Sequence, residues 1–182
     1  MKRIVTTIAI ICATVIVVMA QPRTFGIRAG YNFELSYQHA TSSGMVEVDA
    51  GVTPFLTYKG VMYVDGEAIS QVYNYGRSQL TLSYDWLMDI VPNLNWYIGP
   101  AVGVTWGYGE FFEKQHYDKN GKLVTERRLG LPIGFLAGIE YEFRSPLNIS
   151  IDWRPMVNVF NFNQFDYSST LLNLALCLRY RF

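Results

Sequence analysis

Two histidines are the side chains in this chain best suited to acid–base chemistry. His39 lies just before Ser42 and Ser43, and His116 lies two residues before Asp118. A histidine beside a hydroxyl or a carboxylate is the pairing that activates a nucleophile in an enzyme. His116 falls in a strongly charged stretch, residues 113–118, which favours a solvated loop histidine. We therefore predict no catalytic residue.

A partial cation motif follows in the same stretch. Asp118, Asn120 and Gly121 have the spacing Asp-x-Asn-Gly, but the further oxygen ligands of a calcium loop are missing. Asn-Gly is instead typical of a type I′ turn, which predicts a protruding hairpin within residues 109–128. We expect no metal site and no cofactor.

The beginning of the chain has the pattern of an export signal. Lys2 and Arg3 precede an apolar stretch over residues 4–19, and Ala20 is small enough for cleavage. We expect residues 1–20 to be a signal peptide and residues 21–182 to form one domain. An uncleaved anchor is disfavoured because the stretch is shorter than the roughly 20 residues that a spanning helix needs.

The predicted mature domain is nearly neutral. Removing Lys2 and Arg3 from 15 basic residues leaves 13 against 15 acidic residues, a net charge of −2. That balance excludes the basic footprint of a nucleic-acid-binding protein. Cys177 is the single cysteine after residue 20, so no intramolecular disulfide is expected.

Apolar residues alternate with polar or small ones along most of the domain, which is the period of a β-strand. Seven segments show this alternation clearly, and an up-and-down barrel with both ends on one side needs an even number. An eighth strand follows either from a turn at residues 30–32 or from a further strand near residues 60–70, and we favour the turn. The predicted fold is all-β, an eight-stranded antiparallel up-and-down transmembrane β-barrel. The seven segments are residues 24–38, 46–53, 79–88, 96–108, 129–143, 148–157 and 172–182.

The apolar face is expected to meet lipid. Trp96 and Trp106 lie ten residues apart on one face of one strand, about 25 Å along the barrel axis at the usual rise and tilt. Membrane barrels have an apolar band of about that height, bounded by aromatic girdles, with short turns at one end and longer loops at the other. The predicted girdle residues are Trp86, Trp96, Trp106, Tyr141 and Phe143.

The opposite face carries charges of both signs, which must pair if they are buried. We expect them to fill a closed lumen, with Arg154 pairing with a carboxylate such as Glu140 or Asp152. The predicted network consists of Arg28, Glu34, Glu47, Asp49, Asp85, Glu140, Glu142, Asp152, Arg154, Arg179 and Arg181.

Four segments carry a resemblance to a known family: residues 94–100 (LNWYIGP), 138–143 (GIEYEF), 151–155 (IDWRP) and 178–182 (LRYRF). With these, residues 21–182 resemble the small outer-membrane β-barrel proteins of the OmpX or OmpA-barrel type, especially the outer-membrane β-barrel family of Bacteroides-like bacteria. The resemblance implies residence in the outer membrane of a Gram-negative cell, contact with its lipid and lipopolysaccharide, and delivery by the barrel-assembly machinery. Tyr180 and Phe182 would be the signal that this machinery recognises. Cys177 departs from the glycine expected there.

The expected function is non-enzymatic, a structural or interaction role through extracellular loops whose partner the sequence does not identify. Three alternatives stay open: a narrow pore or transport accessory, a lipid-modifying outer-membrane enzyme, and a soluble lipocalin-like barrel or sandwich. The turn at residues 30–32 would place His39 at the periplasmic end, away from lipid A, which disfavours the enzyme.

Overall fold

The computed structural model describes residues 23–64, 67–109, 116–117, 123–124, 128–159 and 173–182. Every secondary-structure element among them is a β-strand. The predicted signal peptide, residues 1–20, lies outside the described residues, as do most of residues 109–128. In the described part of the chain, no helix is both long and apolar enough to cross a membrane.

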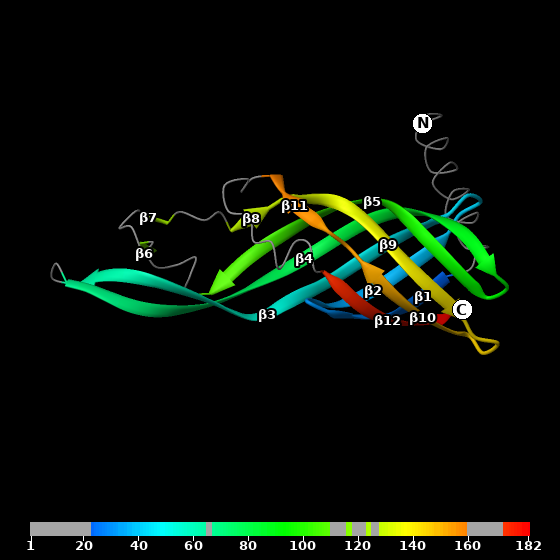
Figure 1. Cartoon of the computed structure of the whole chain (residues 1–182), viewed down its shortest axis with the longest axis horizontal. Helices are drawn as coiled ribbons and strands as arrows, with labels where there is room; N and C mark the ends of the chain where they lie inside the picture. The colour runs from blue at the N-terminus through cyan, green and yellow to red at the C-terminus, as the bar shows by residue number, and fades with distance from the viewer. Residues whose placement is uncertain (1–22, 65–66, 110–115, 118–122, 125–127, 160–172) are drawn as a thin grey trace, which may run out of the picture.

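Eight antiparallel strands close into a barrel, which confirms the predicted fold (Figure 1). The first predicted segment divides at residues 31–32, so the favoured position of the eighth strand is also confirmed. β1 pairs with β12 to complete the closure, from Thr24 opposite Arg181 to Gly30 opposite Ala175. The barrel strands are β1 (Arg23–Gly30), β2 (Phe33–Ala40), β3 (Met45–Val64), β4 (Glu67–Val91), β5 (Leu94–Gly109), β9 (Pro132–Glu142), β10 (Leu147–Trp153) and β12 (Leu174–Arg181).

Four shorter strands extend or decorate this barrel. β8 (Leu129–Gly130) continues the β9 side along β5, and β11 (Met156–Asn158) continues β10 along β9. β6 (His116–Tyr117) pairs with β7 (Leu123–Val124), as expected for a hairpin in this region. The predicted Asn120-Gly121 turn itself lies outside the described residues.

Three tight turns and the two described chain ends share one end of the barrel, whereas the β1–β2 turn at residues 31–32 lies at the other end. Pro92 and Asn93 join β4 to β5, and Asn93 takes a positive φ of 69°, a conformation that asparagine tolerates better than most residues. The β2–β3 and β9–β10 turns lie at the same end. Arg23 and Phe182 meet there as well, because the Phe182 N–H donates a hydrogen bond to the Arg23 carbonyl at 2.9 Å.

Pro100 lies in the middle of β5 without interrupting the barrel. The β4–β5 ladder passes from Ser83 opposite Ala101 to Trp86 opposite Ile98, with no bridge at Pro100 or Gly99. A proline has no N–H to donate, so the missing bridge lies where one is expected. On its other side Pro100 stays in register with Phe135 of β9, and the strand keeps its alternation.

β3 and β4 run far beyond the barrel as a two-stranded arm, formed by residues 56–64 and 67–75. The arm begins at a register shift between Thr53 and Leu56, where the chain contains Pro54. It extends to the left of the barrel in Figure 1. This arm is the second position considered for the eighth strand, and the structure makes it an extension of two strands already in the barrel.

Candidate functional site: the charged lumen and the apolar outer surface

The barrel is inverted relative to a water-soluble protein. Arg28, Arg154 and Arg179 all have exposed fractions of 1% or less, whereas large apolar side chains such as Leu80, Leu174 and Ile151 lie on the outside. In soluble proteins arginine is almost never fully buried. Alternation places every second side chain in the lumen, and the alternating polar residues of the sequence are those that point inward.

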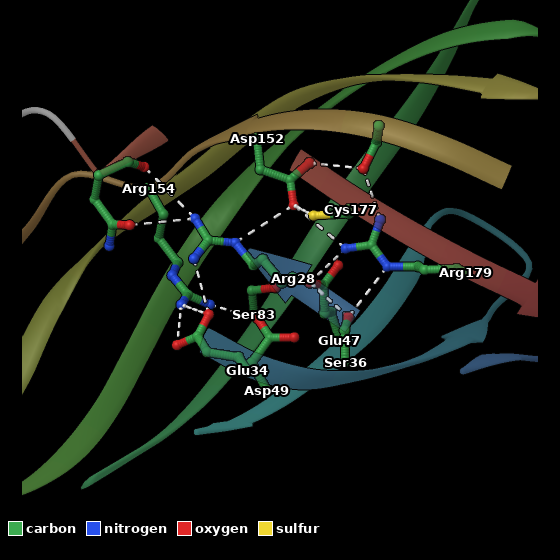
Figure 2. Close-up of polar contacts among 12 residues, drawn as sticks. Arg28, Glu34, Ser36, Glu47, Asp49, Ser83, Asp152, Arg154, Cys177 and Arg179 are labelled. Carbon is green, nitrogen blue, oxygen red and sulfur yellow. Dashed lines mark hydrogen bonds and ion pairs between the residues drawn. The ribbon is translucent and has the colours of Figure 1, made fainter. Parts of the chain in front are cut away.

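Glu34 is the centre of one half of the lumen network. Arg28 Nη1 donates to its Oε2 at 2.8 Å, and Arg154 donates to its Oε1 at 2.6 Å. The other end of the Arg154 guanidinium pairs with Asp49. Gln79 from β4 donates to Glu34 as well. Figure 2 shows the two guanidiniums meeting over this carboxylate.

The Arg154–Asp49 pair crosses the whole lumen. Arg154 follows the end of β10, and Asp49 lies in β3. In the closed order of strands, β10 and β3 are four strands apart in either direction, so they face each other across the barrel. A side chain that bridges opposite walls leaves little room for a continuous channel at that level, because eight strands enclose only enough space for side chains.

Arg179 organises the other half of the network. Its guanidinium pairs with Glu47 at 2.9 Å, with Asp152 at 3.3 Å and with Glu140 at 3.7 Å. It also donates to Ser150 Oγ at 2.7 Å. Because these partners lie on three other strands, Arg179 ties β12 to β3, β9 and β10. Arg28 Nε, 3.5 Å from Asp152, joins the two halves.

The pairing predicted for Arg154 is wrong. Glu140 and Asp152 pair with Arg179, and Arg154 pairs with Glu34 and Asp49. Glu140 lies opposite Ser150 of β10. Ser150 precedes Arg154 by four residues, so Glu140 lies at a different level of the barrel from Arg154. Arg154 instead reaches across the lumen to the carboxylates at its own level.

Two members of the predicted network lie at its edge. Arg181 and Glu142 pair with each other, but their side chains are 35% and 28% exposed. Asp85 is fully buried and accepts a hydrogen bond from Ser83 at 2.7 Å. Among the described residues, three buried arginines therefore face six buried carboxylates. The six are Glu34, Glu47, Asp49, Asp85, Glu140 and Asp152.

The predicted girdle residues all lie on the outer surface. Trp86, Trp96, Tyr141 and Phe143 lie toward the end with the short turns, and Trp106 lies toward the other end, near Gly109. The rings of Tyr141 and Phe143 form an edge-to-face pair with centroids 5.0 Å apart. The outer aromatic surface therefore has two levels, one near each end of the barrel.

The two histidines lie in different parts of the described structure. His39 lies near the end of β2, beside the tight turns, and His116 pairs through its backbone with Val124 in the β6–β7 hairpin. Within the described ranges, no group of three or more His, Cys, Asp and Glu side chains is placed to hold a metal ion.

Tyr97 is the lumen residue that sequence reasoning missed. It is fully buried, and its hydroxyl hydrogen-bonds with Asp152 and with Ser150 at 3.2 Å. Its ring lies over Gly138, where a β-carbon would collide with it. The signal was the alternation itself, which puts Tyr97 on the face opposite Trp96. A small residue, Gly138, on the neighbouring strand makes the space for the ring.

Comparisons with known proteins add little to this geometry. No protein-family model matches the chain, and no curated protein matches it. Among solved structures, the chain is similar to Neisserial surface protein A (NspA), with 10% sequence identity over 88% of this chain and 90% of that one, at a TM-score of 0.39. A similarity that weak carries no argument about function here.

Proposed function

We propose that this chain is a non-enzymatic outer-membrane β-barrel that holds an extracellular arm available for binding a partner. The inverted surface supports membrane residence, because apolar residues outside and charges inside match a barrel surrounded by lipid. The chain ends and the three tight turns beside them then face the periplasm, and the arm and the β1–β2 turn lie on the side of the cell exterior. Ion pairs across the lumen support a closed barrel rather than a pore.

The arm is the observation that carries the interaction role. Residues 67–74 of β4 pair with β3 and lie beyond the last β4–β5 bridge, which joins Tyr75 to Gly109. Part of the surface of β4 therefore lies outside the barrel ladder.

The arm also carries exposed apolar side chains. Ile69 and Val72 are 46% and 49% exposed, although they lie beyond the barrel, where we expect water rather than lipid. Glu67 and Lys59 are also exposed. We infer a protein partner whose apolar side chains pack against Ile69 and Val72 of the arm.

Cysteine labelling of intact cells tests the placement and orientation. Lys59→Cys puts a thiol on the arm, and Arg144→Cys puts a matched thiol in the β9–β10 turn at the opposite end. The native Cys177 is buried in the lumen and should not react. We expect a membrane-impermeant maleimide to label Lys59→Cys in intact cells and Arg144→Cys only after lysis, with both proteins in the outer-membrane fraction. The reverse labelling, or recovery in a soluble fraction, would contradict the proposal.

Charge on the exposed apolar side chains of the arm tests the interaction role separately. Ile69→Asp and Val72→Asp each place a carboxylate where we expect the apolar side chains of the partner, and both residues lie outside the barrel ladder. Glu67→Gln is the matched control, because it changes an exposed polar residue of the same arm. The partner captured by surface crosslinking from Lys59→Cys should be lost in both aspartate variants and kept in the control. Capture that survives both aspartate variants would rule out these side chains as the docking site.

A further inference from the structure

The outer surface contains one pronounced apolar groove, with a volume of about 830 Å³. It crosses β5, β9, β10 and β12 toward the end that holds the short turns. Its lining includes Leu94, Trp96, Ala137, Tyr141, Trp153 and Leu176. The groove lies inside the belt of exposed apolar side chains.

Ala137 is the cause of the groove. The other outward residues of β9 are large, including Phe135, Ile139 and Tyr141, whereas Ala137 has a single methyl group. Its partners across the two ladders are Trp153 on β10 and Ile98 on β5. A small residue between two large ones leaves a depression that a flexible hydrocarbon chain can fill through close contacts.

Aromatic pairs fix both ends of the depression. Phe135 and Trp153 pack edge to face with ring centroids 5.3 Å apart, and Tyr141 and Phe143 do the same at 5.0 Å. Such pairs hold the rings in defined positions. From Tyr141 to Ala137 the groove runs about 13 Å along β9 at the usual strand rise. The depression therefore has a stable shape and the extent of a substantial part of an acyl chain.

An exposed cation lies in the turn three residues after Tyr141, which lines the groove. Arg144 is exposed in the turn between β9 and β10, the two strands at the centre of the groove. An arginine at a membrane surface attracts anionic lipid. We propose that the groove binds one acyl chain of an anionic phospholipid of the periplasmic leaflet, with its phosphate beside Arg144. This inference rests on the membrane placement proposed above.

Trp153 reports on the groove, and Trp86 lies outside its lining. The experiment uses two single-tryptophan variants, retaining Trp153 or Trp86, refolded into phosphatidylcholine vesicles that contain a small fraction of lipid with brominated chains. Bromine quenches the tryptophans that it contacts. Quenching also depends on how deep the bromine lies relative to the tryptophan. Brominated phosphatidylglycerol and brominated phosphatidylcholine carry identical chains, so comparing them at equal mole fraction cancels this effect. Heat-modifiable migration confirms that each variant is folded.

We expect phosphatidylglycerol to be enriched at Trp153 about fivefold, the factor that one arginine near an anionic headgroup supplies. At Trp86 the two lipids should quench equally. Ala137→Phe, which fills the groove, and Arg144→Gln should both remove the enrichment at Trp153. Leu35→Phe, an outward substitution on β2 away from the groove, should preserve it.

Two results would overturn the inference. The first would leave the proposed membrane placement intact, and the second would not. Equal quenching by the two lipids at both tryptophans would show that lipid contacts the groove without selection, and the membrane barrel would stand. If neither lipid quenched Trp153 or Trp86, both the lipid-binding groove and the proposed membrane placement would be overturned.

Discussion

The lumen and the arm are built from the same strands but stabilised differently. Within the barrel, β3 and β4 have neighbours on both sides, and their inward side chains join a network of arginines and carboxylates. In the arm the same two strands pair mainly with each other, and β3 adds one bridge from Val61 to Tyr117. Ile69 and Val72 remain exposed there.

Strand length also distinguishes β3 and β4, which form the arm, from other strands of the barrel. β1, β2 and β12 have 8 residues each, whereas β3 has 20 and β4 has 25. A strand crosses the apolar part of a membrane in about 9–11 residues. The additional length of β3 and β4 is therefore not needed for spanning. The difference indicates that the barrel supplies stability and that the arm supplies a surface.

The largest expected effect comes from breaking the bridge across the lumen. Arg154→Ala leaves Glu34 without one of its two arginines and Asp49 without its ion-pair partner in the described network. Removing one partner of a buried ion pair typically costs about 3–5 kcal/mol. We expect the free energy of unfolding, measured by urea titration of the refolded barrel, to fall by that amount.

Lys59→Ala in the arm is the matched control, because it removes one exposed cation outside the barrel. Surface substitutions of that kind usually change stability by no more than about 0.5 kcal/mol. Equal urea midpoints for Arg154→Ala and Lys59→Ala would mean that the lumen charges are solvated, and the distinction between the two regions would fail.

A smaller effect is expected at the edge of the network. Arg181 and Glu142 are partly exposed, so water screens their attraction. Exposed pairs contribute about 0.2–1 kcal/mol. A double-mutant cycle with Arg181→Ala and Glu142→Ala should give a coupling energy in that range, falling further in high salt. A coupling energy as large as that of the buried pairs would mean that the closed lumen extends as far as Arg181 and Glu142.

The barrel was predictable because its strands separate two unlike environments. Apolar side chains outside and charges inside impose a period of two, so Phe25 and Ile27 alternate with Gly26 and Arg28. The arm was not recognised because its sequence does not show this regular period of two. Around Val61 the alternation is weak, and the sequence alone left this region as an uncertain extra strand.

The choice of ion-pair partners was not predictable for a different reason. Alternation places Arg154 and eight other charges in the same lumen, but it says nothing about the stagger of one strand against another. That stagger puts Arg154 level with Glu34 and Asp49 and leaves Glu140 to Arg179. Tyr97 was missed although its position obeys the alternation, because an inward aromatic ring needs a glycine, Gly138, on the next strand.

The smallest effect should follow removal of the arm. Replacing residues 57–74 by a short turn leaves Leu56 and Tyr75 paired at the base. We expect the free energy of unfolding to change by less than about 0.5 kcal/mol, because loop length has a weak effect on stability. Partner capture should be lost at the same time. Failure of the shortened protein to refold would show that the arm stabilises the barrel, and the two regions would no longer be separable.

Single-channel recording in a planar bilayer tests the closed, charge-paired lumen most directly. With Arg154 bridging β10 and β3, and Arg179 bridging β12 and β3, the wild-type barrel should insert without conducting at neutral pH. Arg154→Ala, if folded, is the variant in which brief openings should first be seen. Steady ohmic conductance of the wild-type protein at neutral pH would contradict the account, because a continuous water path cannot coexist with side chains that join opposite walls of the lumen.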